Sequence, residues 1–240
     1  MKILPAIDLR EGACVQLVGG SYDDERVRLP DPLAICRKFS GAGLVEQHIV
    51  DLDAALGKGS NLAVIEQIAK EPGVTIEVGG GIRTSEDVTR LIELGVARVI
   101  VGTRAIEDLA WLEIVAAKFP ERILLAADVR GRTIVTRGWT KTLELTIGEL
   151  LKTVATLPLA GALVTAVHVE GQMTGPDLDL VREAVASKTR IFASGGISSL
   201  EDLRALKTTG AHAVVVGMAI YTGRIDPNDA AREMSRELVK

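Results

Sequence analysis

Short runs of β-branched and aliphatic residues alternate with amphipathic stretches along the whole chain, and this alternation limits the possible folds more than any other feature. Such an alternation is typical of parallel strands that are joined by helical crossovers. Eight strands and eight helices allow the sheet to close into a barrel, whereas a doubly wound sheet usually has fewer strands. We therefore predict an α/β fold, specifically a (βα)8 TIM barrel.

The predicted strands cover residues 2–7, 47–52, 74–78, 98–102, 122–129, 163–169, 190–194 and 213–217. The predicted helices lie near residues 31–40, 60–70, 85–94, 107–118, 146–156, 178–187, 199–208 and 228–238. Hydrophobic residues make up 47% of the chain and aromatic residues only 3%, so we expect a core of Val, Ile, Leu and Ala, as in strands buried on both faces. No Pro/Gly/Ser-rich linker interrupts the series, which predicts a single domain over residues 1–240.

A glycine pair and the residues around it occur twice at a constant spacing. Gly80-Gly81-Ile82 recurs 115 positions later as Gly195-Gly196-Ile197. The same spacing relates Glu86-Asp87 to Glu201-Asp202, Gly95 to Gly210, Val99 to Val214, Val101 to Val216 and Gly102 to Gly217. This period is too long for a solenoid repeat. We interpret it as two duplicated half-barrels within one chain, and we expect function to be duplicated with the structure.

Each copy of the repeat has the pattern of a phosphate-binding turn, which is a strand, a glycine pair and the start of a helix. The pair is Gly80-Gly81 in the first copy and Gly195-Gly196 in the second. Glycine lets backbone N–H groups converge, and a helix start adds free donors and a positive dipole end. In the second copy, Ser198 and Glu201 have the spacing of a capping box.

A second element of each predicted phosphate site follows the next strand, as Gly102-Thr103 in one copy and Gly217-Met218 in the other. In TIM barrels, phosphate often lies between the loops after strands 7 and 8, and the repeat predicts the same arrangement after strands 3 and 4. Two sites across the barrel mouth predict a small-molecule substrate with a phosphate at each end. The alternative is that these glycines serve only tight turns.

Two aspartates are expected at the barrel mouth. Asp8 falls at the end of the first predicted strand and Asp128 near the end of the fifth, and both have apolar neighbours in the sequence. Strands 1 and 5 face one another across an eight-stranded barrel, and barrel active sites form at the carboxyl ends of the strands. The alternative is a structural ion pair with Arg10 or Arg130.

Opposed carboxylates suit aldose–ketose isomerisation. One group protonates the ring oxygen to open a furanose, and the other removes the proton from C2. A carboxylate pair performs both steps near neutral pH if its surroundings separate the two pKa values. The sequence contains neither a metal-ligand cluster nor a GxGxxG fingerprint, so we predict no metal and no cofactor.

Charge and composition exclude several classes of protein. A net charge of −4 gives no general attraction to nucleic acid or to anionic membranes. Cys14 and Cys36 are the only cysteines, which supports neither a disulfide framework nor a zinc site. The N-terminus reaches a carboxylate too early for a signal sequence, and no uncharged run approaches the roughly 20 residues that span a bilayer. We predict a cytoplasmic protein.

Taken together, these residues resemble the phosphoribosylformimino-aminoimidazole-carboxamide ribotide (ProFAR) isomerases of histidine biosynthesis. The resemblance covers essentially the whole chain and rests on Pro5–Leu9, His48–Asp53, Gly79–Arg83, the strand of Asp128, Gly138-Trp139, Gly195–Ile197 and Val216–Ala219. It implies an Amadori rearrangement of a substrate with two ribose phosphates. Asp8 is then the proton acceptor and Asp128 a candidate donor.

The chain departs from the pattern of this family at two places. Gln16 stands where the family usually has Arg, and Glu170 stands where the family has the Asp of an Asp-Gly pair. Because that Asp is a candidate catalytic acid, we include Glu170 among the catalytic residues. Glu170 displaces the carboxylate by about one methylene, and misplacing a catalytic group by about 1 Å costs roughly a hundredfold.

Four further residues complete the predicted substrate site. Thr165 lies near the end of the sixth strand, and Arg83 is expected to assist phosphate binding. Trp139 follows a predicted hairpin at residues 130–133, where it either stacks on the imidazole ring as a lid or anchors the hairpin. His48 belongs to the matched motif, although for His48 and His212 a packed or surface position is the favoured interpretation.

Three other functions stay open. The sister cyclase of the same pathway usually begins with Cys-Leu-Asp, which Ile7-Asp8-Leu9 does not match. A dual-specificity isomerase would also accept phosphoribosylanthranilate of the tryptophan pathway, and residues 51–61 resemble such enzymes. A non-catalytic phosphosugar-binding barrel would bind ligand without turnover. We predict a monomer without nucleic-acid or membrane partners.

Overall fold

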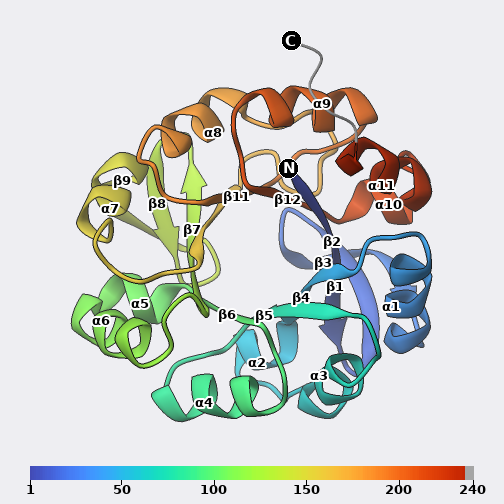
Figure 1. Cartoon of the computed structure of the whole chain (residues 1–240), viewed down its shortest axis with the longest axis horizontal. Helices are drawn as coiled ribbons and strands as arrows, with labels where there is room; N and C mark the ends of the chain where they lie inside the picture. The colour runs from blue at the N-terminus through green and yellow to red at the C-terminus, as the bar shows by residue number, and fades with distance from the viewer. Residues whose placement is uncertain (236–240) are drawn as a thin grey trace.

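The computed structural model describes residues 1–235, in which eight parallel strands form a closed barrel inside a ring of helices (Figure 1). The strands are β1 (Lys2–Arg10), β4 (Glu46–Asp51), β5 (Thr75–Gly79), β6 (Arg98–Val101), β7 (Ile123–Arg130), β10 (Gly161–Ala166), β11 (Ile191–Ser194) and β12 (Ala213–Val216). Each pairs in parallel with the next, and β12 pairs with β1 to close the barrel. The predicted (βα)8 barrel is confirmed, and each predicted strand overlaps one of these eight.

The long helices cover the outside of the barrel (Figure 1). They are α1 (Pro32–Gly41), α3 (Leu62–Ala69), α4 (Ser85–Glu93), α6 (Leu109–Lys118), α7 (Ile147–Thr153), α8 (Leu178–Val185), α9 (Leu200–Thr208) and α11 (Pro227–Ser235). Three short helices that we did not predict follow strands, namely α2 (Leu52–Leu56), α5 (Thr103–Glu107) and α10 (Met218–Tyr221). Positions 236–238 of the last predicted helix lie outside the described residues. Within residues 1–235, every helix is too short or too polar to cross a bilayer.

Two strands continue beyond the barrel edge and form hairpins at opposite sides of the mouth. β1 continues into β2 (Ala13–Val18) and β3 (Ser21–Leu29), and β7 continues into β8 (Thr133–Thr136) and β9 (Lys141–Thr146). Asp8 pairs with Val15, and Asp128 pairs with Val135. The predicted hairpin at residues 130–133 is confirmed, whereas the β2–β3 hairpin was not predicted. Both aspartates therefore lie where a barrel strand begins to pair with its hairpin.

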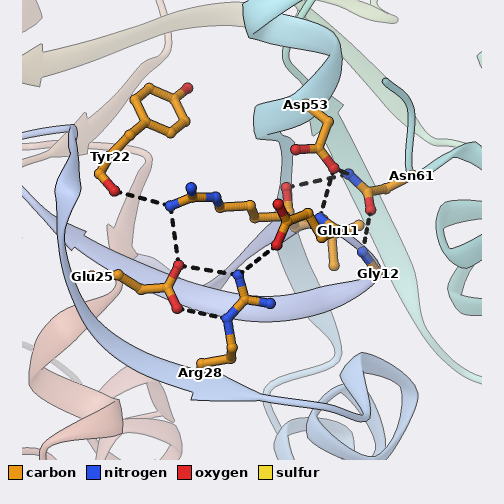
Figure 2. A network of polar contacts seen from close by, with 9 residues as sticks. Glu11, Gly12, Tyr22, Glu25, Arg28, Asp53 and Asn61 are labelled. Atoms are coloured by element: carbon orange, nitrogen blue, oxygen red, sulfur yellow. Dashed lines mark hydrogen bonds and ion pairs between the residues drawn. The ribbon is translucent and has the colours of Figure 1, made fainter. Parts of the chain in front are cut away.

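A polar network fastens the base of the β2–β3 hairpin to the barrel rim (Figure 2). The backbone N–H of Glu11 donates to Asp53 at 2.6 Å, and that of Gly12 donates to Asn61 at 2.8 Å. Arg28 of β3 forms an ion pair with Glu11 at 3.0 Å. These contacts join β1, β3 and the segment after β4, so the hairpin starts from a fixed position on the rim.

The sixth predicted strand and the predicted capping box differ from the structure. β10 ends at Ala166 instead of residue 169, because Val167–Gly171 form turns. The helix cap is one residue later than predicted, since Ser199 and Asp202 form the capping box of α9. The hydroxyl of Ser198 donates to the same Asp202 carboxylate, which explains why two adjacent serines could be confused.

The glycine turns after β5 and β11 bring the backbone unusually close to a neighbouring segment. Gly81 has φ +70°, and a Cβ there would lie 2.3 Å from the carbonyl oxygen of Ala54. Gly196 has φ +79°, and a Cβ there would lie 2.2 Å from the carbonyl oxygen of Gly175. Only glycine satisfies both constraints at these positions. This close approach fixes the turn that each candidate phosphate site uses.

Substitution of Gly81 by alanine should therefore destabilise the fold by more than the strain of a positive φ, because the added Cβ also clashes with the carbonyl of Ala54. Gly73 is a matched control, because it has a similar φ of +75° but no atom within 4 Å of an added Cβ. We expect Gly73→Ala to cost about 1–2 kcal/mol of unfolding free energy, and Gly81→Ala to cost about 2 kcal/mol more. Urea unfolding measures both values. Equal losses would contradict the close approach.

Candidate active site

Asp8 and Glu170 line one cavity at the carboxyl ends of the barrel strands. Asp8 comes from β1 and Glu170 from the turn after β10, and the wall of the cavity also includes Gln16, the glycines 195, 196 and 217, and Met218. Burial raises the pKa of the Asp8 carboxyl to about 6, although the nearby His48 counteracts part of the rise. Asp8 is therefore a base that is ionised at neutral pH and accepts a proton more readily than an ordinary aspartate.

Glu170 holds its proton more strongly than Asp8. Burial raises the pKa of the Glu170 carboxyl to about 7, and the negative charges of Asp8 and Asp128 raise it further. Its Oε2 atom is buried and has no hydrogen-bond partner in the part of the chain that the structure describes. The backbone is fixed, because the carbonyl of Glu170 accepts a hydrogen bond from Gly19 at 3.2 Å. A carboxyl group that is partly protonated near neutral pH has the property of a general acid.

Asp128 lies on β7, across the barrel from β1, and its carboxylate already has partners. It accepts a hydrogen bond from the indole Nε1 of Trp139 at 2.8 Å and another from the Thr165 hydroxyl. Burial raises the pKa of Asp128, while these two hydrogen bonds lower it. The predicted alternative of a structural ion pair is not observed among residues 1–235, since Arg130 donates to the Trp139 carbonyl and Arg10 binds Glu25.

Trp139 connects the two hairpins at the mouth. Its ring lies against Gly20 in the turn between β2 and β3, so closely that a Cβ on Gly20 would be 2.6 Å from the ring. The hairpin after β7 thus reaches the hairpin after β1, directly above Asp128. These contacts join Trp139 to Gly20 and Asp128. They do not decide between the two predicted roles, a stacking lid and a hairpin anchor, and both remain predictions.

Gln16 links Asp8 to the second glycine site. Its side chain is only 4% exposed, and its Nε2 donates to Asp8 at 3.3 Å and to the carbonyl of Val15 at 2.9 Å. A Cβ on Gly217 would lie 2.5 Å from Oε1 of Gln16, so a larger residue at this position would displace the Gln16 amide. Gln16 contributes a neutral amide, so it gives the Asp8 carboxyl a hydrogen bond but no positive charge.

The two glycine sites present free backbone donors. Within residues 1–235, no backbone carbonyl accepts a hydrogen bond from the N–H groups of Gly80-Gly81 or Gly195-Gly196. Gly102 and Gly217 stand at the N-caps of α5 and α10, at matching positions of the repeat and with nearly equal backbone angles. The turns need glycine for their own geometry, and the free donors leave them able to bind an anion as well.

Other predicted site residues lie at varied distances from this cavity. Thr165 is buried and pairs with Asp128 in the sheet, and Thr103 accepts a hydrogen bond from the backbone of Arg137 at 3.0 Å. Met218 is buried at the start of α10. Arg83 is exposed, and its guanidinium donates to the carbonyls at the end of α2 instead of extending freely toward the glycines.

A buried charge network below the cavity was not predicted. His48 is buried, which agrees with the packed position favoured from the sequence. Its Nδ1 lies 2.7 Å from Glu77, which has no exposed surface and also binds Arg98. The signal in the sequence that could have revealed this network is a single charged residue in each of two otherwise apolar strands, namely Glu77 and Arg98. Among residues 1–235, no group of three or more His, Cys, Asp or Glu side chains has the arrangement of a metal site.

Comparisons with known proteins agree on one family. The family model described as histidine biosynthesis protein matches residues 2–226. The chain is 54% identical to a protein of Myxococcus xanthus over 98% of this chain and 100% of that protein, and 50% identical to one of Gemmatimonas aurantiaca over 97% and 99%. A protein of Methanothermobacter thermautotrophicus is 40% identical over 97% and 98%. All three are named 1-(5-phosphoribosyl)-5-((5-phosphoribosylamino)methylideneamino)imidazole-4-carboxamide isomerase.

The raised pKa of Glu170 predicts a pH-dependent gain in stability when the group is neutralised. Its pKa is about 7 in the folded chain against an ordinary value of 4.5, so folding takes up a proton between these values and stability falls as pH rises through them. We expect Glu170→Gln to be more stable than the parent by about 1–3 kcal/mol at pH 8, and this advantage to disappear at pH 4.

Urea unfolding at both pH values measures this difference. Glu113→Gln is the control, because Glu113 is an exposed residue of α6 whose replacement should change stability by less than about 0.5 kcal/mol. If Glu170→Gln were less stable than the parent at pH 8, Glu170 would have a stabilising partner as a carboxylate, and its assignment as an acid would be wrong.

Proposed function

The chain belongs to the histidine biosynthesis protein family, and from this premise we propose that it is the aldose–ketose isomerase for which its relatives are named. The reaction is the Amadori rearrangement of the aminoaldose bisphosphate ProFAR to its ribulosyl form. The observation that carries the proposal is the pair of carboxyl groups, Asp8 and Glu170, in one cavity with pKa values of about 6 and about 7. Such a pair supplies a base and an acid at the same pH.

Ring opening is the first step that the site supports. Glu170 donates its proton to the furanose ring oxygen, and the bond from that oxygen to C1 breaks to leave a protonated imine between C1 and the nitrogen. Asp128 is the alternative donor, as the sequence suggested. We assign the proton to Glu170, because both interactions of Asp128 with Trp139 and Thr165 favour its ionised form.

Proton transfer at carbon follows. Asp8 removes the proton from C2, and the electron pair of that bond forms the double bond of an enaminol between C1 and C2. Asp8 then returns the proton to C1, while the C2 hydroxyl loses its proton to the Glu170 carboxylate. The product is a C2 ketone, and both carboxyl groups have regained their starting states. Each correctly placed group accounts for roughly 10²–10⁴-fold in rate.

The glycine sites are proposed to hold the two phosphates. The first would use Gly80-Gly81 with Gly102-Thr103, and the second Gly195-Gly196 with Gly217-Met218. The free N–H groups at both glycine pairs support this assignment. The second site shares its cavity wall with Asp8 and Glu170, so a phosphate bound there would fix the sugar that reacts.

Several broader properties remain part of the proposal. We expect one domain over residues 1–240, a monomer, a cytoplasmic location, no cofactor, and no nucleic-acid or membrane partner. The matching capping boxes at Thr84–Asp87 and Ser199–Asp202 support the duplication of two half-barrels. Acceptance of phosphoribosylanthranilate is the second candidate activity.

Steady-state turnover of ProFAR, coupled to the next enzyme of the pathway and followed by absorbance, tests this function. Phosphoribosylanthranilate is run in parallel, and turnover of both substrates would make the enzyme dual-specific. Asp8→Asn should lower kcat by about 10³-fold, because the base at C2 is lost, while bisphosphate binding by calorimetry stays within about threefold. Asp179→Asn, an exposed residue of α8, is the control. Tight binding without turnover by the parent chain would instead indicate a phosphosugar-binding barrel.

A further inference from the structure

Five charged or titratable side chains form a continuous network inside the barrel, below the cavity of Asp8 and Glu170. Lys2 binds Glu46, and Arg98 binds Glu46 at 3.0 Å and Glu77 at 2.9 Å. Glu77 in turn lies 2.7 Å from Nδ1 of His48. Exposure falls along this series, from 43% for the side chain of Lys2 to zero for Glu77. The network therefore runs from solvent into the closed interior.

Glu77 determines which nitrogen of His48 carries a hydrogen. Glu77 forms an ion pair with Arg98 at 2.9 Å, and a carboxylate in an ion pair only accepts hydrogen bonds. Nδ1 of His48 must therefore be the donor in the 2.7 Å contact. The second ring nitrogen, Nε2, lies on the edge of the ring away from Glu77. A carboxylate behind a histidine fixes ring orientation and tautomer in this way at many catalytic and metal sites.

His48 lies one step below Asp8 on the adjacent strand. Ala6 pairs with His48 and Asp8 pairs with Val50 in the parallel ladder of β1 and β4, so the two side chains are offset by two residues, or about 6.6 Å. A charge on His48 lowers the pKa values of both Asp8 and Glu170. The titratable groups around the imidazole are therefore Glu77 from β5, Asp8 from β1 and Glu170 from the turn after β10.

We propose that Glu77 is a positioning residue for the isomerisation, which it supports by holding His48 in a fixed orientation beneath Asp8 and Glu170. This inference rests on the proposed function and adds a residue to it. In its protonated form, with hydrogens on both ring nitrogens, the imidazole stabilises the negative charge that stays on one carboxyl group whenever the other is protonated during the reaction. Arg98 neutralises the second oxygen of Glu77, which allows a carboxylate to remain fully buried at this depth.

The test is Glu77→Gln in the full-length chain. Its amide preserves the side-chain shape but presents a donor to Nδ1, so Nδ1 loses its hydrogen and the ring can no longer carry hydrogens on both nitrogens. We expect kcat for ProFAR to fall about 10–100-fold with KM within about twofold. The acidic limb of kcat/KM should move to higher pH, because Asp8 loses stabilisation of its ionised form.

A matched control separates this role from a structural one. Glu46→Gln breaks ion pairs of the same network farther from His48, so it should lower Tm while the pH profile stays unchanged. If Glu77→Gln does not fold, because Arg98 loses one of its two carboxylate partners, the double variant Glu77→Gln/Arg98→Met removes both buried charges and should show the same kinetic change.

A second readout does not depend on turnover. Nitrogen-15 NMR of the imidazole should show a hydrogen on Nδ1 of His48 in the parent chain and its loss in Glu77→Gln. The proposal is wrong if Glu77→Gln retains the parent kcat and pH profile, or if the His48 signals do not change. Changed His48 signals together with a parent enzyme that fails to turn over ProFAR would overturn the proposed function, and not the action of Glu77 on His48.

Discussion

Every charged group that enters a closed parallel barrel must find a partner or give up its charge, because the interior is filled by side chains and holds little water. The two ends of this barrel show both outcomes. Glu77 has no exposed surface and remains paired with Arg98 and His48. At the mouth, Asp8 and Glu170 have no cationic partner in hydrogen-bond contact among residues 1–235, and burial raises their pKa values instead. The site chemistry follows from this difference.

The fold supplies the positions that this chemistry needs. β1 and β7 lie on opposite sides of the barrel, and each carries an aspartate at the point where its hairpin begins. The glycine turns after β5 and β11 approach neighbouring backbone so closely that no other residue fits. The same turns present free N–H groups, so one structural requirement serves both packing and anion binding. Gln16 connects Asp8 to Gly217, which follows β12 and belongs to the second glycine site.

Most of the fold could be predicted from the sequence, because hydrophobic alternation reports each buried strand directly. The site was predicted in part. Asp8 and Glu170 do share a cavity, but the contact of Trp139 with Asp128 depends on two loop conformations that no local pattern specifies. β3 was missed because its residues alternate charged side chains without an apolar face. Glu77 was missed because a single charge in a strand does not reveal whether it faces the interior.

The surroundings of Asp8 and Glu170 divide these mouth carboxyl groups into a base and an acid. Carbon-13 NMR titration of the Asp and Glu carboxyl signals tests it most directly, with Asp8→Asn and Glu170→Gln used to assign the two signals. We expect Asp8 to titrate near pH 6 and Glu170 near pH 7 in the folded chain. If both groups were already ionised at pH 5, neither would be a proton donor at neutral pH, and the assignment of a base and an acid would be wrong.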